Sequence, residues 1–160
     1  MATINFTQSS NSSQSNGSKN NARLIDARGP RFGAILTTIV LALALVTHSP
    51  ILIGFQLAIF TIGAFVGPNK SPYAFLYKKL VRPHLSGEVP TEDIRPPQFA
   101  QKIGFLFAVL ALSGSLLGIP LLFTIATSFA LAAAFLNGAF NYCLGCEMYL
   151  LIIRATNRSK

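Results

Sequence analysis

Two long stretches of the chain contain no Asp, Glu, Lys or Arg, and they determine its predicted architecture. The first runs from Gly33 to Asn69, and the second runs from Ile103 to Cys146. A helix on the surface of a water-soluble protein carries charged residues on its outer face. The centre of a bilayer excludes charge, at a cost of at least about 2.5–3.5 kcal/mol per residue. The pattern therefore predicts an integral membrane protein.

Each charge-free stretch is too long for one membrane-spanning helix, which needs about 20 residues. Each also contains one break. Pro50 lacks an N–H and disfavours helix at the residue before it, so His48-Ser49-Pro50 predicts a tight turn, as does Gly118-Ile119-Pro120. The predicted fold is therefore an all-α membrane protein with two helical hairpins, whose four transmembrane helices cover residues 32–47, 50–66, 98–117 and 121–140.

Two polar segments lie outside these helices. Residues 1–22 are rich in Ser, Asn and Gln and cannot bury enough apolar surface to order themselves, so they predict a disordered cytoplasmic tail before a membrane domain over residues 23–160. Between the hairpins, Ser71-Pro72 is typical of a helix start. Tyr73, Leu76, Tyr77 and Leu80 follow at helical spacing and predict an amphipathic helix over residues 72–83. Two interpretations remain open, a helix on the membrane surface and one packed on the protein.

The basic residues indicate an orientation. All thirteen Lys and Arg lie before the first predicted helix, between the second helix and the first turns of the third (where Lys102 lies), or after the fourth. Four spans place these segments on one side of the membrane, and the positive-inside rule makes that side cytoplasmic. The chain has a net charge of +8, but its basic residues flank apolar spans and no nucleic-acid recognition motif accompanies them. We therefore expect a multi-pass protein with both termini in the cytoplasm, whose basic residues meet lipid headgroups and bind no nucleic acid.

A short motif occurs twice, each time at the start of a predicted hairpin. Asp26-Ala27-Arg28-Gly29-Pro30-Arg31-Phe32 and Asp93-Ile94-Arg95-Pro96-Pro97-Gln98-Phe99 share Asp, Arg, Pro and Phe at the same spacing. The match indicates a duplicated hairpin, with copies of the same orientation related by a pseudo-two-fold axis along the membrane normal. The motif is either an entry and anchoring device or a polar site. In the second case we expect Asp26 near Arg95 and Asp93 near Arg28.

The candidate chemistry lies in Cys143-Leu144-Gly145-Cys146, which contains both cysteines of the chain. A two-residue spacer lets two thiols meet in a small ring, so we expect their α-carbons within about 7 Å. If a helix begins at Cys143, its free N–H groups favour a thiolate there, and Cys146 would resolve a mixed disulfide. Metal binding and structural packing remain open. Metal binding would need Glu147 or the four thiolates of a homodimer, and we predict no bound metal or cofactor.

The apolar segment after the motif, from Glu147 to Ile153, is too short to span a membrane alone. It either extends the fourth helix or lies in the membrane interface. Near it, Asn137 and Asn141 stand four residues apart and are expected to face the same way.

Several of these elements together resemble a family of small bacterial membrane proteins, domain of unknown function 4395. The resemblance covers residues from Ile25 to Arg154 and rests on the paired Asp-x-Arg-x-Pro-x-Phe motifs, Phe99-Ala100-Gln101, Ala134-Phe135-Leu136-Asn137 and Cys143-Leu144-Gly145-Cys146-Glu147-x-Tyr149. It implies a location in the bacterial inner membrane. It implies no established activity, substrate or catalytic residue.

Three functions are consistent with this sequence, and they leave open whether the protein is an enzyme. The first is thiol redox or sulfur transfer with a cytoplasmic thioredoxin-like partner through Cys143 and Cys146. Its weakness is that the chain has no second thiol pair to carry electrons further. The second is a small oligomeric transporter or channel, although no charged residue lies deep inside the predicted spans. The third is a structural membrane subunit.

Overall fold

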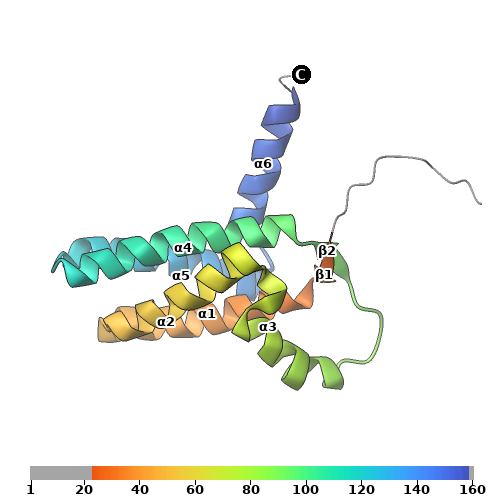
Figure 1. The fold of residues 1–160 in the computed structure, drawn as a ribbon, viewed down its shortest axis with the longest axis horizontal. Helices are drawn as coiled ribbons and strands as arrows, with labels where there is room; N and C mark the ends of the chain where they lie inside the picture. Colours follow the sequence, from red (N-terminus) through yellow and green to blue (C-terminus); the bar gives the residue numbers. More distant parts are fainter. Residues whose placement is uncertain (1–22, 159–160) are drawn as a thin grey trace, which may run out of the picture.

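The computed structural model describes residues 23–158, so the predicted tail over residues 1–22 lies outside the described part. The chain is almost entirely helical there, and Figure 1 shows its arrangement. The elements are β1 (Leu24–Asp26), α1 (Arg28–Thr47), α2 (Pro50–Thr61), η1 (Ile62–Val66), η2 (Pro68–Lys70), α3 (Pro72–Leu76), η3 (Tyr77–Val81), η4 (Arg82–His84), β2 (Thr91–Asp93), α4 (Arg95–Leu116), α5 (Pro120–Phe140) and α6 (Leu144–Arg158).

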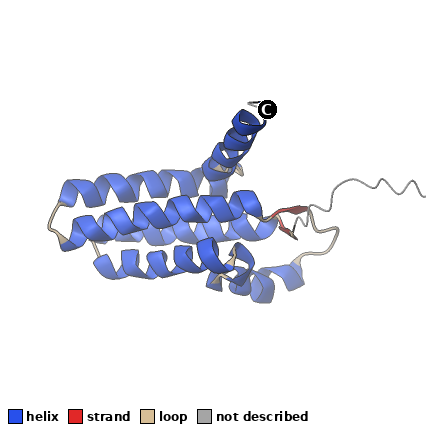
Figure 2. Ribbon diagram, turned by 45° about the horizontal axis from the view of Figure 1, so that its top comes forward, coloured by secondary structure: helices blue, strands red, loops and turns tan. Residues whose placement is uncertain are grey.

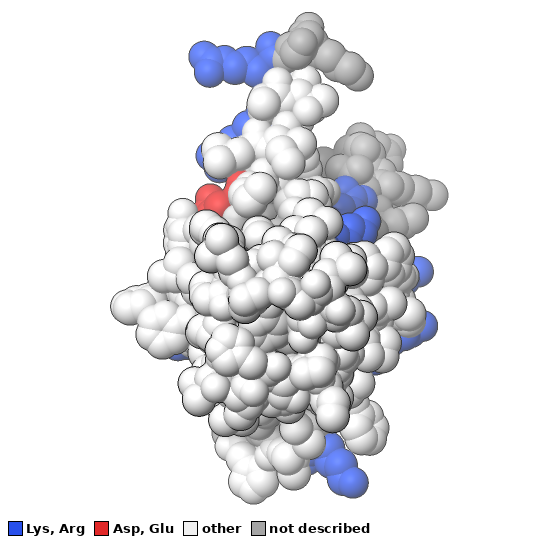
Figure 3. Space-filling model, turned by 90° about the vertical axis from the view of Figure 1, so that its left-hand side faces the viewer, with Lys and Arg blue, Asp and Glu red and all other residues white. Residues whose placement is uncertain are grey.

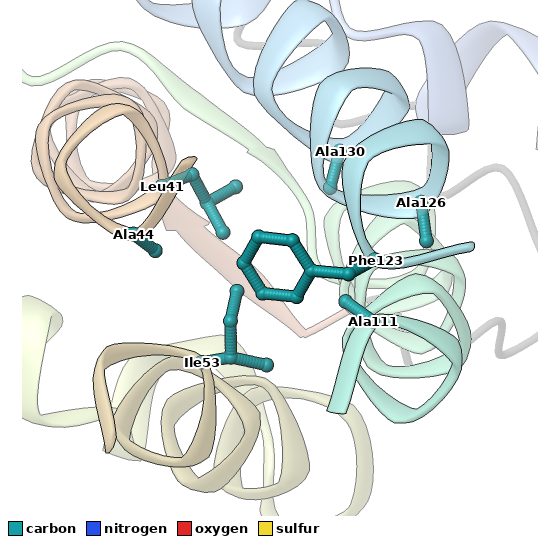
Figure 4. Packing of buried hydrophobic residues seen from close by; sticks show 7 residues of the cluster. All are labelled: Leu41, Ala44, Ile53, Ala111, Phe123, Ala126 and Ala130. Atoms are coloured by element: carbon teal, nitrogen blue, oxygen red, sulfur yellow. The ribbon is translucent and has the colours of Figure 1, made fainter. Parts of the chain in front are cut away.

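Four helices run side by side as a bundle, and α6 leaves it at a steep angle (Figures 1 and 2). Within the bundle, α1 packs against α2 and α5, while α4 packs against the same two helices. The core between them includes four alanines, Ala44, Ala111, Ala126 and Ala130, which let the helix backbones approach closely. Figure 4 shows the ring of Phe123 filling the space between Leu41 of α1, Ile53 of α2 and Ala111 of α4.

The predicted helices are present, but two begin earlier than expected. The first and third helices start at Arg28 and Arg95, three or four residues ahead of the predicted starts. The reason lies in the repeated motif. The carboxylates of Asp26 and Asp93 accept the N–H of Arg28 and Arg95, at 2.9 and 3.0 Å, and so cap each helix before its prolines. Proline is tolerated in a first helical turn, so the motif opens the helix instead of preceding it.

The second and fourth helices agree closely with prediction. Pro50 and Pro120 begin α2 and α5 directly after the two predicted turns. The second helix reaches Val66 as expected, although its last turn, η1, is a π-helix.

Two short strands join the starts of the two hairpins. β1 and β2 pair antiparallel, with Leu24 opposite Asp93, Ile25 opposite Glu92 and Asp26 opposite Thr91. Two further backbone hydrogen bonds flank the pairing. Ala27 N–H donates to Pro90 at 2.9 Å, and Ile94 N–H donates to Arg23 at 3.0 Å. This small sheet lies at the end of the bundle where α1 and α4 begin (Figure 1).

The segment between the hairpins is helical but irregular. In place of one amphipathic helix over residues 72–83, α3 continues into the π-helix η3 and the 3-10 helix η4. Tyr73 and Tyr77 are buried, and α3 contacts α1, so the segment packs on the protein. Leu80, on the same predicted stripe, stays exposed.

Three helices, α1, α4 and α5, are long and apolar enough to cross a membrane, while the apolar segment Pro50–Val66 is shorter. The outer surface agrees with a lipid environment, because large apolar side chains such as Val46 and Ile51 are about 80% exposed. An aqueous protein surface rarely carries apolar area on this scale. These features indicate a membrane protein.

Candidate functional site: a disulfide beside a cavity in the helix bundle

Cys143 and Cys146 are joined by a disulfide, with α-carbons 5.1 Å apart, as their spacing predicted. The chain breaks between α5 and α6 just before this pair. Asn141 ends α5 in the left-handed conformation, which Asn tolerates better than most residues. α6 then begins at Leu144, so the two cysteines do not lie inside a continuous fourth helix.

Cys143 stands at the start of α6. Its carbonyl oxygen accepts the N–H of Glu147 at 3.0 Å, and its Sγ accepts the N–H of Cys146 at 3.3 Å. The sulfur of Cys143 therefore occupies the place of a capping side chain, where the free N–H groups and the helix dipole favour negative charge. Both cysteines are half-buried, so neither is enclosed in the core of the described chain.

The first turn of α6 is held tightly on α4. A side chain at Gly145 would place its Cβ 2.6 Å from the Cα and Cβ of Ala100, which only a glycine avoids. One turn further, the rings of Tyr149 and Phe99 pack with centroids 5.7 Å apart. Beyond this contact α6 is exposed along its length, including its apolar residues Leu151 and Ile152. The apolar segment from Glu147 to Ile153 is thus part of a separate 15-residue helix and does not extend α5.

The disulfide forms part of the wall of a cavity of about 370 Å³. The cavity is lined by α1, α4, α5 and the first turns of α6, with one residue from α2. Its apolar wall includes Phe60, Phe107, Phe129, Ala130, Ala133 and Ala134. Its polar groups are Arg31, Thr37, Glu92, Gln101, Asn137, Asn141 and Glu147. A volume of this size falls within the range of small-molecule binding sites.

The polar groups of the cavity have different surroundings. Arg31 is anchored, because its Nε donates to the carbonyl oxygen of Gly138 at 3.2 Å and ties the start of α1 to the end of α5. The amide of Gln101 has a buried Oε1 that no donor reaches within residues 23–158. Asn137 and Asn141 both line the cavity, in agreement with the prediction that they face the same way.

The predicted polar site at the repeated motif is only partly assembled. The strand pairing brings Asp26 and Asp93 to the same small sheet. Each carboxylate accepts the N–H of the arginine in its own motif, and Asp26 also accepts the hydroxyl of Tyr77 at 3.0 Å. Across the described part of the chain, no ion pair joins Asp26 to Arg95 or Asp93 to Arg28. Each aspartate thus bonds to the backbone of its own motif and not to the arginine of the other copy.

The small sheet influences the titration of two neighbouring groups. Burial, together with the nearby carboxylate of Asp26, raises the pKa of Glu92. Burial and the hydrogen bond to Asp26 raise the pKa of Tyr77. Both shifts favour the neutral form, because a buried ionised group loses hydration.

The arrangement is suited to sulfur chemistry more than to metal binding. Within residues 23–158 no group of three or more His, Cys, Asp or Glu side chains could hold a metal ion. A disulfide at a helix N-terminus can accept a thiolate, and its reduced form can donate one. The cavity beside it could hold a small, largely apolar molecule.

Sequence reasoning missed the cavity and most of its polar lining. Arg31 belongs to the repeated motif, but its contact with Gly138 joins helices that are far apart in the sequence. Gln101 could have been singled out from the sequence, because its polar amide lies at the start of a mostly apolar span. Nothing in the sequence indicated that α6 would turn away from α5 and leave the cysteines at a cavity wall.

Comparison with known proteins agrees with the resemblance seen in the sequence. No curated protein and no solved structure matches the chain. Among protein families, residues 25–154 match the domain of unknown function DUF4395. This range includes both hairpins, the disulfide and most of α6. The chain therefore belongs to the DUF4395 family.

Proposed function

We propose that the protein is a membrane-embedded thiol–disulfide exchange protein that acts through Cys143 and Cys146. The observation that carries this proposal is the position of the disulfide, half-buried at the N-terminus of α6 and in the wall of the cavity. A cysteine pair that served only to fill space would need neither a helix start nor a glycine between its members. Here Gly145 permits the close contact with Ala100 that fixes the turn.

The proposed setting is the bacterial inner membrane, crossed four times with both termini in the cytoplasm. The shorter segment Pro50–Val66 is the remaining span, and it runs beside the three long helices in Figure 2. Figure 3 looks onto the end of the bundle that carries the two turns, and charged residues appear only around its rim. The positive-inside rule assigns this end to the periplasm and the disulfide to the cytoplasmic side.

We further propose that the two hairpins are copies of one ancestral unit. The hydrogen bonds around the strands support this, because they come in matched pairs. Asp26 and Asp93 cap their helices alike, and Ala27 and Ile94 donate to corresponding residues of the opposite copy. A two-fold axis through the Ile25–Glu92 pair relates these contacts.

The proposed partner is a thioredoxin-like protein of the cytoplasm. In exchange with an oxidised partner, the Cys143 thiolate attacks the partner's disulfide and forms a mixed disulfide. Cys146 then attacks the sulfur of Cys143, which releases the reduced partner and restores the Cys143–Cys146 disulfide. The reverse sequence reduces the pair. Electrons are conserved in both directions, because one disulfide is formed for each one broken.

Trapping of the mixed disulfide tests this proposal. Native membranes containing Cys146→Ser are incubated with a purified thioredoxin whose second active-site cysteine is replaced by serine and whose first is activated as a mixed disulfide with thionitrobenzoate. Attack by Cys143 releases thionitrobenzoate, and non-reducing gels report a complex that reductant dissolves. We expect the complex with Cys146→Ser, and much less with Cys143→Ser, because only Cys143 lies at the helix start. Capture by neither variant would refute the proposed exchange.

A further inference from the structure

The chain contains no second redox group with which the disulfide could exchange electrons. Cys143 and Cys146 are its only cysteines. A pair that accepts electrons from a partner's thiols can therefore turn over only if an external two-electron acceptor reoxidises it. A second soluble thiol protein could reoxidise the pair from outside the bundle. The disulfide also borders the largely apolar cavity, however, so an apolar acceptor could reach it from there.

The cavity extends from the disulfide far into the bundle. Its lining on α5 runs from Asn141, beside the cysteines, to Phe129. At about 1.5 Å rise per residue, this part of the helix is about 18 Å long, roughly half the thickness of the hydrocarbon core. A molecule in the cavity would thus touch the disulfide at one end and lie at lipid depth at the other.

The lining fits a flat, weakly polar ring. Phe107 and Phe129 lie on facing helices with centroids 6.0 Å apart and planes inclined by 20°, and both border the cavity. The two rings stack on each other, so a planar ring in the cavity would contact their outer faces or edges. Asn137 and Gln101 border the same space. The buried Oε1 of Gln101 packs against Gly63 of η1 and has no donor among the described residues. Amides can donate to carbonyl oxygens and accept from hydroxyl groups.

From these observations we propose that the cavity is a binding site for a membrane quinone, which reoxidises the reduced Cys143–Cys146 pair. This inference rests on the proposed thiol exchange and names its electron acceptor. A quinone combines the required properties: it is lipid-soluble, planar and carbonyl-bearing, and it accepts two electrons. Its ring would enter the cavity while its apolar tail remained in lipid.

The redox step balances without any other reactant. One cysteine thiolate adds to the quinone ring, forming a carbon–sulfur bond. The second thiolate attacks that sulfur, so the sulfur–sulfur bond forms as the carbon–sulfur bond breaks and its electron pair passes to the ring. The two thiols lose two electrons and two protons in total. The quinone ring gains the two electrons and the two protons and departs as the quinol.

The test uses the full-length protein, reduced with dithiothreitol, freed of reductant and placed in liposomes without quinone. The probe is a short-chain ubiquinone analogue, whose ring carries no hydrogen, so that a thiolate adduct cannot lose a ring proton to become a permanent thioether. A maleimide mass tag measures the loss of free thiols, and absorbance measures quinol. We expect one quinol for each disulfide formed.

Two matched variants of α5 locate the reaction. Ala134→Phe fills the cavity, whereas Ala132→Phe adds the same ring at an exposed position outside the cavity lining. Gln101→Leu is a second cavity variant that adds little volume. Exchange with thioredoxin is measured on the same samples, and the ratio of the quinone rate to the exchange rate is compared. We expect this ratio to fall about tenfold or more in Ala134→Phe, and to fall in Gln101→Leu, but to be unchanged in Ala132→Phe.

Failure of this inference differs from failure of the proposed function. If wild-type thiols exchange with thioredoxin but are not oxidised by the quinone, or if all variants are oxidised at one rate, the quinone site is refuted and the exchange function stands. An acyl chain occupying the cavity would give this result. If no exchange with thioredoxin occurs, the proposed function fails, while the quinone reaction is still judged on the chemically reduced protein.

Discussion

Single residues hold the first turn of α6 and the middle of the bundle in place. Gly145 allows the cysteine turn to rest on the backbone of α4 at Ala100. In the bundle, Gln56 is fully buried, donates to Thr37 Oγ1 at 3.2 Å and accepts the Tyr73 hydroxyl at 3.0 Å. Burial raises the pKa of Tyr73 to about 12, so this hydroxyl remains a donor at all physiological pH values. Each of these contacts depends on the identity of one residue.

Gly145→Ala should destabilise the protein and loosen the disulfide turn. Its Cβ would lie 2.6 Å from Ala100, so α6 must move away from α4, at a cost of about 1–3 kcal/mol. Gly54→Ala is the matched control, because no atom lies within 4 Å of its added Cβ. In a helix it should stabilise by up to about 1 kcal/mol. The measurement is the free energy of unfolding in detergent micelles, and equal values for the two variants would contradict the close contact.

Tyr73→Phe should destabilise the protein by about 1–3 kcal/mol, because it leaves the buried Oε1 of Gln56 without its donor. Tyr142→Phe removes a hydroxyl from an exposed side chain and should change the unfolding free energy little. Chemical denaturation of both variants in the same micelles measures the difference. A Tyr73→Phe protein as stable as wild type would show that the buried network does not form.

At the scale of elements, regular helices were predictable and irregular ones were not. The lengths and breaks of the apolar stretches gave the number of bundle helices, because burial in lipid leaves a strong sequence pattern. The early starts of α1 and α4 depend on the Asp caps. The distortion from α3 into η3 and η4 depends on docking Tyr73 and Tyr77 against the bundle. The direction of α6 depends on Asn141 and on the contact at Gly145, neither of which has a periodic signature.

The β1–β2 sheet should make stability depend on pH through Glu92. Its pKa is raised in the folded protein, so the folded state binds more protons than the unfolded state above the ordinary value of 4.5. Stability must then fall as pH rises from about that value through the raised pKa. Glu92→Gln should remove this part of the pH dependence. Melting temperatures measured against pH test it, with Glu88→Gln, in the exposed loop before β2, as the control. Equal slopes in wild type and Glu92→Gln would contradict the assignment.

The whole molecule combines a helix bundle with α6, which leaves the bundle at a steep angle. Because α1 and α4 both start at the β1–β2 sheet, the returning helices bring the cysteines back to that same end (Figure 1). An even number of bundle helices therefore places the disulfide at the end of the bundle where α1 and α4 begin, the end that carries Arg28 and Arg95. The sequence predicted this arrangement through charge, but the cavity arises from packing among α1, α4, α5 and α6 and was not predictable.

Reporter fusions test the proposed topology. Fusions after Asn21, near Gly87 and after Lys160 should all report the cytoplasm, because basic residues flank the spans on those segments. A fusion between Thr47 and Pro50 should report the periplasm and serves as the opposite control. A periplasmic signal after Lys160 would contradict the four-span arrangement.

The redox behaviour of Cys143 and Cys146 in native membranes is the most direct test of the proposed function. Membranes are treated with reductant or oxidant, quenched in acid, and labelled with a maleimide mass tag that counts free thiols. A half-buried pair at the start of α6 should pass reversibly between disulfide and dithiol, and reduced Cys143 should react with an alkylating agent below about pH 8.5, the ordinary value of a free thiol. Two cysteines that stay in one state under both treatments, or that remain unreactive when reduced, would contradict the account.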